Sequence, residues 1–229
     1  MIPLAGITTD VLSERISAIL RVNVTAPLPG LSQPVLFSRV YSSCIVSGMS
    51  SLSGIDPAVA ASLGFRKAEY TVVERERRWL CAAIPRDQIR QTLTVTDLYV
   101  DDTRLRLRDM RPSDGGAPLL RLTRKADVDP RTRLITSIYL PEPEFAVLAA
   151  ALKGQRLTKT RYRLHAPPGI LLSVDQFQGE LAGLILAEAE FQNDEALAAF
   201  AIPPFAIREV TAEPEYTGAW LARHGLPRR

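Results

Sequence analysis

Acidic and basic side chains alternate along one short stretch of the sequence in a way that could bind a metal ion beside an anion. Glu74, Glu76 and Arg78 follow residues 70–73, which are β-branched or aromatic and predict a strand. Alternate side chains of a strand share one face, so these three groups project from the same side in steps of about 7 Å. Carboxylate oxygens are the ligands that hard divalent cations prefer, and a guanidinium beside them suits an anionic ligand. The alternative interpretation is a charged edge strand that faces solvent.

Other predicted strands carry charges of one sign on one face. These residues are Arg104, Arg106 and Arg108; Lys125 at a strand end; Lys159, Arg161 and Arg163; and Glu188 with Glu190. The faces are either the solvated outside of an ordinary sheet or the inner lining of a wide barrel whose leucines pack outward. A surface selected for solubility mixes the two signs, so the sorting by sign favours the inner lining. Like charges about 4 Å apart cost about 4 kcal/mol at an effective dielectric near 20, so such a lining needs a polyanion.

The elements that must position these residues are mostly short strands separated by turn signals. Strands are expected over residues 70–80, 97–100, 104–108, 119–125, 133–140, 156–164, 171–177, 184–191 and 206–211, and helices over 144–152, 194–200 and 214–223. This order predicts a mainly β, α+β fold of antiparallel strands with peripheral helices. Closure into a barrel is the natural way for such a sheet to avoid bare edges.

The motifs together, in their order, resemble those of the CYTH family, the triphosphate tunnel metalloenzymes. They are Glu74-x-Glu76-x-Arg78, Arg104-x-Arg106-x-Arg108, Thr123-Arg124-Lys125, Lys159-Thr160-Arg161-Tyr162, Asp175-Gln176-Phe177-x-Gly179 and Glu188-x-Glu190-Phe191. The resemblance covers most of residues 67–229 and implies an eight-stranded antiparallel β-barrel, the triphosphate tunnel. It also implies Mg²⁺ or Mn²⁺ held by glutamates on a bound tri- or polyphosphate.

Site residues follow from this resemblance position by position. The implied metal ligands are Glu74, Glu76, Glu188 and Glu190, and the implied phosphate contacts are Arg78, Arg106, Arg108, Lys125, Lys159 and Arg161. Within this set we expect Glu76, Glu190 and Lys159 to be catalytic. Two positions depart from the family pattern. Arg78 stands where the family usually has Lys, and the strand over 134–140 lacks the further pair of glutamates that several members carry, so a second metal or the activation of water would be missing or differently supplied.

The leading functional interpretation is a metal-dependent phosphohydrolase that acts on inorganic tripolyphosphate, polyphosphate or an organic triphosphate. An adenylyl cyclase of the class IV type is an alternative, because the family contains such enzymes. A third interpretation is a non-catalytic module that binds polyphosphate or a nucleotide, and a fourth is an ordinary barrel with charged outer faces.

Composition bounds the remaining properties. The chain has 229 residues and a net charge of +3, which does not indicate a nucleic-acid binder. Its two cysteines, Cys44 and Cys81, support neither a disulfide framework nor a zinc site, so a cytoplasmic location is expected. No apolar run reaches the roughly 18 residues of a membrane span. The expected partner is a small molecule with a tri- or polyphosphate group; homodimerisation is left open.

Residues 1–66 carry few charges and no chemical motif. Asp10 could cap a short helix over residues 11–20. The segment is predicted to be an N-terminal extension. Either it is disordered, or the translation start is assigned too far upstream and Met49 is the alternative start. A small docking element is a less favoured interpretation. The tunnel domain is predicted over 67–229. Asp175 is expected to shape a turn, and Trp79 to pack against the core.

Overall fold

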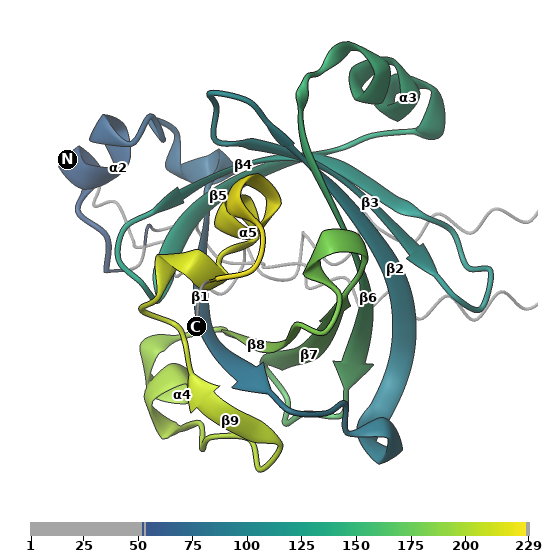
Figure 1. Ribbon diagram of the computed structural model, residues 1–229. Helices are drawn as coiled ribbons and strands as arrows, with labels where there is room; N and C mark the ends of the chain where they lie inside the picture. Colours follow the sequence, from purple (N-terminus) through teal and green to yellow (C-terminus); the bar gives the residue numbers. More distant parts are fainter. Residues whose placement is uncertain (1–51, 53, 228–229) are drawn as a thin grey trace, which may run out of the picture. The chain divides into compact units, whose positions relative to one another are not determined.

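The barrel is built from one antiparallel sheet that closes on itself. The computed structural model describes residues 52 and 54–227, and its strands follow the order β5-β4-β3-β2-β6-β7-β8-β1-β9. An additional pairing joins β5 to β1, with Val72 opposite Ile135 and Glu74 opposite Arg133. This pairing closes β1–β8 into an eight-stranded barrel (Figure 1), and the predicted fold class is confirmed.

Every strand expected from the sequence is present in the described residues. The strands are β1 Val72–Cys81, β2 Ile89–Val100, β3 Leu105–Pro112, β4 Leu119–Asp127, β5 Thr132–Tyr139, β6 Gly154–Leu164, β7 Ile170–Phe177, β8 Ile185–Phe191 and β9 Ala206–Glu209. The helices are α2 Pro57–Ser62, α3 Glu142–Ala151, α4 Asp194–Ala199 and α5 Gly218–His224, with short 3-10 turns at Ala68–Tyr70, Arg86–Gln88, Gly179–Leu181 and Pro214–Tyr216.

Two elements differ from the sequence-based expectation. The strand predicted over 97–100 is the last third of the 12-residue β2, because the preceding polar residues alternate with Leu93 and Val95, whose side chains are buried. The helix predicted over 214–223 is divided into the turn Pro214–Tyr216, here called η4, and α5. Thr217 separates them, and its side chain caps α5 by accepting a hydrogen bond from the Trp220 backbone N–H.

The two faces of the barrel wall have opposite character. Trp79, Val174, Ala187 and Ala189 are completely buried and form a hydrophobic cluster with residues of α4 and the segment after it. Trp79 alternates along β1 with Arg78, so its neighbours point to the opposite side of the wall. The apolar face is therefore the outer one, and the charged face lines the interior, which decides between the two arrangements that the sequence left open.

A further apolar cluster joins the segment before β1 to the barrel. Ala60 of α2 and Phe65 pack with Ala126 of β4 and Leu134 of β5. The Arg124 guanidinium donates to the Leu63 carbonyl at 2.7 Å and lies 4.6 Å from the centre of the Phe65 ring. Residues 57–65 thus contribute to the core, although the sequence-based division assigned them to the extension. The helix predicted over 11–20 and the alternative start at Met49 lie outside the described residues.

In the part of the chain that the structure describes, none of the helices has the length and apolar character needed to cross a membrane.

Candidate active site: a charged tunnel

A cavity of about 320 Å³ lies inside the barrel, and charged side chains dominate its lining. All ten site residues implied by the sequence line it: Glu74, Glu76, Arg78, Arg106, Arg108, Lys125, Lys159, Arg161, Glu188 and Glu190. The lining also includes Arg104, Arg121, Asp127, Arg133 and Arg223, so ten cationic side chains face five carboxylates. This excess of positive charge suits an anionic ligand.

Strand pairing brings the four glutamates together on one wall. In the register of β1 and β8, Glu76 lies opposite Glu190, and Arg78 lies opposite Glu188. Glu74 is two residues before Glu76 and shares its face. The alternating sequence of each strand therefore produces a compact group of carboxylates once the two strands pair.

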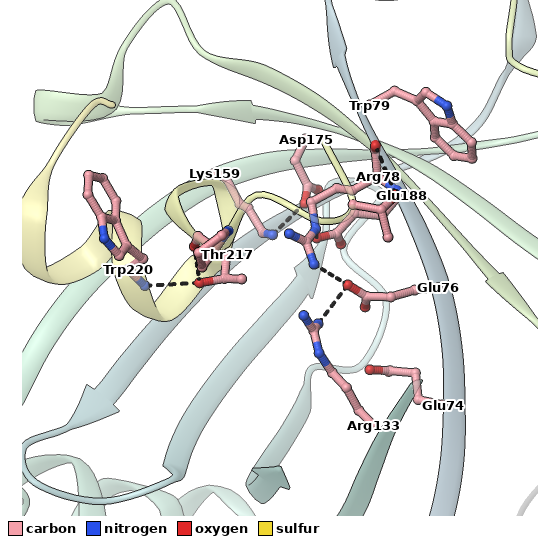
Figure 2. A network of polar contacts seen from close by, with 12 residues as sticks. Glu74, Glu76, Arg78, Trp79, Arg133, Lys159, Asp175, Glu188, Thr217 and Trp220 are labelled. Carbon is pink, nitrogen blue, oxygen red and sulfur yellow. Dashed lines mark hydrogen bonds and ion pairs between the residues drawn. The ribbon is translucent and has the colours of Figure 1, made fainter. Parts of the chain in front are cut away.

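Three of the glutamates are neutralised by cations of the lining. Lys125 Nζ donates to Glu74 Oε2 at 2.7 Å. Arg133 Nη1 lies 2.6 Å from Glu76 Oε1, the same oxygen that accepts from Arg78 Nη2, and Figure 2 shows these two guanidinium groups meeting at Glu76. Burial alone would raise the pKa of Glu74, but the charge and hydrogen bond of Lys125 lower it.

Glu190 differs from its neighbours, because no ion pair with it is found among the described residues. Burial raises the pKa of Glu190 to about 7, and the negative charge of Glu74 contributes to the rise. Glu188, by contrast, accepts a hydrogen bond from Arg161 at 2.6 Å, and Lys159 and Arg161 keep its pKa well below the ordinary value despite its burial. The group of glutamates therefore carries one carboxylate that is destabilised when ionised.

Two buried aspartates orient the cations on the other strands. Asp97 of β2 is completely buried and accepts from Arg108 Nε and Nη2 at 2.6 and 2.7 Å, while Arg106 Nε lies 3.5 Å away. Its pKa is held far below the ordinary value, since the charges of Arg108 and Arg106 outweigh the effect of burial. Each cation held in this way keeps a defined position without ligand.

Asp175 plays the same part for β6. It lies within β7 with 1% of its surface exposed, accepts from Arg161 Nε and Nη2 at 2.7 Å each, and also accepts from Lys159 (Figure 2). The expectation that Asp175 shapes a turn is therefore wrong. The role of Asp175 could have been predicted only by placing its carboxylate opposite the two cations of the neighbouring strand. That placement depends on the register of the two strands, which the sequence alone does not fix.

Several buried guanidinium donors have no hydrogen-bond partner among the described residues. Those of the tunnel lining are Nε and Nη1 of Arg78, Nε and Nη2 of Arg106, and Nε of Arg121, whereas Nη1 of Arg124 lies outside the lining. A buried donor without a partner is costly, and a charged one more so. Their position in the tunnel lining indicates that a ligand with several acceptor oxygens would satisfy them.

The C-terminal helix covers one opening of the barrel. Four residues of η4, α5 and the junction between them line the cavity: Tyr216, Thr217, Gly218 and Arg223. Figure 1 shows α5 across the opening that faces the viewer. Gly218 lets α5 approach Tyr99 closely, because a Cβ at this position would lie 2.0 Å from the hydroxyl oxygen of Tyr99 and one of the two would have to shift.

Two arginines predicted at strand ends have different positions. Arg104 is exposed at the rim and contributes to the cavity lining. Arg163 is exposed, lies 3.4 Å from the side-chain oxygen of Gln91, and is not among the cavity-lining residues. Trp79 packs in the outer core, as expected.

The glutamates suit a divalent metal by their chemistry. Four glutamates lie on two paired strands, and the pKa of Glu190 is raised first by its burial and then by the charge of Glu74, both of which a bound cation would counter. Within the described residues, no three carboxylate, histidine or cysteine side chains are already arranged as a metal site. Metal binding would therefore exchange some of the present ion pairs for metal–oxygen contacts.

Comparisons with known proteins identify the family of the chain. No family model matches the chain. The inorganic triphosphatase of Nitrosomonas europaea is 32% identical over 156 residues, which are 66% of this chain and 97% of the relative. Among solved structures, one described as an inorganic triphosphatase is 29% identical with a TM-score of 0.44 and covers 65% of this chain and 96% of its own. A protein of Pyrococcus horikoshii OT3 is 20% identical with a TM-score of 0.43 and covers 55% and 82%. The assignment rests on the Nitrosomonas relative, because both TM-scores are below 0.5. The chain belongs to the CYTH family, the triphosphate tunnel metalloenzymes.

Proposed function

We propose that the protein hydrolyses inorganic triphosphate, or a short polyphosphate or organic triphosphate, inside the tunnel with the help of a divalent metal ion. The observation that carries the proposal is the set of buried donors of Arg78 and Arg106 that lack a hydrogen-bond partner in the described part of the chain and lie in the same cavity as four glutamates. Such donors call for an anion with many oxygens, and the glutamates call for a cation. The name of the Nitrosomonas relative supports triphosphate as the substrate.

The cations would hold the phosphate chain and stabilise the reaction electrostatically. Arg106, Arg108 and Lys125 contribute from β3 and β4, and Lys159 and Arg161 contribute from β6. A water molecule attacks the terminal phosphorus, and preorganised cations offset the charge on its oxygens in the transition state. The ion pairs to Asp97 and Asp175 keep the cations of β3 and β6 in place before the substrate binds.

The proposed metal is Mg²⁺ or Mn²⁺, with Glu74, Glu76, Glu188 and Glu190 as its ligands. When bound, the ion would neutralise phosphate oxygens and make the phosphorus more electrophilic. Glu190 is also the carboxylate of this group with the highest pKa in the metal-free tunnel, about 7, so it is the ligand whose ionisation metal binding would favour most.

The experiment is phosphate release from tripolyphosphate, ATP and thiamine triphosphate, first with Mg²⁺ and then with Mn²⁺. Glu76→Gln and Glu190→Gln should each lower turnover by at least about 100-fold, because they alter groups that act on the reacting phosphate. Glu144→Gln is the matched control, since Glu144 is an exposed glutamate at the start of α3, and its activity should equal that of the unmodified protein.

Other outcomes would point to other functions. Full activity in both tunnel variants, with the metal still required, would refute this assignment of the glutamates. Cyclic nucleotide formed from ATP would indicate the cyclase alternative, which no observation favours. Tight binding of tripolyphosphate without turnover under either metal would indicate a binding module.

A further inference from the structure

Arg121 is a tunnel cation that the family resemblance did not assign. It lies in β4, lines the cavity, and stands opposite Arg108 in the pairing of β3 with β4. Seven other buried or half-buried cations of the lining have a carboxylate oxygen within 3.5 Å: Arg78, Arg106, Arg108, Lys125, Arg133, Lys159 and Arg161. Arg121 has no such ion pair with any described residue. Arg104 and Arg223 are also unpaired there, but both are exposed to solvent.

The surroundings of Arg121 are unfavourable for a cation in the ligand-free tunnel. Burial lowers its pKa, and the positive charges of Arg108 and Arg106 lower it further; Tyr139 and Glu190 offset only part of this. Its Nε is buried and has no hydrogen-bond partner among the described residues. Arginine nevertheless stays protonated in proteins, so the charge persists and only an added anion can compensate it.

The position of Arg121 along the tunnel indicates which part of a ligand it would meet. Arg106 pairs with Tyr99, whose hydroxyl approaches Gly218 at the end that α5 covers. Arg108 and Arg121 lie two residues further along the strands, about 7 Å from that level. An elongated anion that lies along the tunnel would reach Arg121 with the phosphate farther from α5.

We propose that Arg121 contacts an outer phosphate group and thereby makes the tunnel prefer a chain of three phosphates to a chain of two. The proposal rests on the proposed function only in taking a triphosphate as the ligand of the tunnel. Arg121 is in this view a specificity-determining contact, and the remaining cations hold the phosphates that both chains share.

Isothermal titration calorimetry of tripolyphosphate and of diphosphate tests the proposal. It is performed without divalent metal, so that binding is measured apart from turnover. Arg121→Gln should weaken tripolyphosphate binding by about tenfold or more, as expected for losing a charge-assisted contact, and should change the diphosphate Kd by less than about threefold. Arg121→Lys should recover part of the loss, because it keeps the charge without the planar donor pair.

Arg111→Gln is the matched control. Arg111 lies on β3, is 53% exposed, and pairs with Asp109 and Glu142 away from the tunnel, so its replacement should leave both affinities unchanged. Equal weakening of the two anions by Arg121→Gln, or no weakening of either, would overturn the proposal.

Thermal unfolding separates a binding role from a structural one. Without any anion, Arg121→Gln should unfold at the same temperature as the unmodified protein or higher, because it removes an uncompensated charge. With tripolyphosphate, its gain in Tm should be smaller than that of the unmodified protein. A lower Tm without anion would show that Arg121 supports the fold and would contradict the proposal. Binding of tripolyphosphate without turnover would refute the hydrolase and leave this inference intact, whereas no binding by the unmodified protein would overturn it.

Discussion

Replacing Asp97 by Asn tests whether the buried aspartates hold the tunnel cations in place. Asp97 has no exposed surface, accepts two hydrogen bonds from Arg108 and lies 3.5 Å from Arg106. The substitution keeps the size and one acceptor of the side chain but removes its charge. Two buried guanidinium groups of β3 then lose the carboxylate that offsets their charge.

The expected loss of stability can be worked from these contacts. Removing one partner of a buried ion pair costs about 3–5 kcal/mol, and we take the lower end, about 3 kcal/mol, because Asn retains one acceptor. For a domain of this size each kcal/mol lowers Tm by about 2–4 °C, so Asp97→Asn should unfold about 6–12 °C below the unmodified protein.

The assay is thermal or urea unfolding of the ligand-free protein between pH 3 and pH 8. The folded-state pKa of Asp97 is depressed, so its stabilising effect is complete above the ordinary aspartate pKa of about 3.9 and declines as the pH falls below it. The difference in unfolding free energy between the two proteins should therefore be constant from pH 5 to pH 8 and shrink below about pH 4.

Asp109→Asn on the neighbouring strand is the control. Asp109 pairs with Arg111, which is 53% exposed, so this exchange should cost less than about 1 kcal/mol. A loss of stability for Asp97→Asn no larger than that of the control would refute the reasoning. So would a difference that stays unchanged at pH 3.

Two further predictions concern the glutamate group and the helix that covers the tunnel. In ligand-free protein the raised pKa of Glu190 should make stability fall as the pH rises from about 5 to 8, and Glu190→Gln should remove this fall and gain up to about 3 kcal/mol at pH 8 in urea unfolding. If the unfolding free energies of the two proteins changed with pH in parallel, this prediction would be wrong. Gly218→Ala should lower the unfolding free energy by about 1–3 kcal/mol, because its Cβ would overlap the Tyr99 hydroxyl. The additional change Tyr99→Phe should recover part of that loss, and no recovery would show that the overlap is not the cause.

The sequence predicted much of the site because alternation along a strand is a local property. The face shared by Glu74, Glu76 and Arg78 follows from their spacing, and the structure confirms that they line the cavity. The alternation alone could not show whether the charged face or the apolar face of the strands lines the interior of the barrel. That depends on where the apolar side chains find partners, here Trp79 against the segment around α4.

The ion pairs between neighbouring strands could not be predicted from the sequence for a different reason. Asp97 appeared as the start of a strand and Asp175 as a turn residue, since their ion pairs depend on the register of neighbouring strands. Arg133, now bonded to Glu76, was counted only as the first residue of a strand without carboxylates. The metal and phosphate roles of the ten predicted site residues and the cytoplasmic location stay predictions, and homodimerisation stays open.

The pairing of β1 has a consequence for how the chain folds. Among the described strands, those that pair with β1 are distant from it in the sequence: Glu76 contacts Arg133 57 residues later, and Arg77 contacts Glu209 132 residues later. Folds dominated by such distant contacts fold slowly, and β1 leaves the ribosome long before β8. During that interval it is an unpaired edge, and edges invite pairing with other chains. The charges on its inner face are a known deterrent to such pairing, so the side chains proposed to bind metal and phosphate would also protect the strand until the barrel closes.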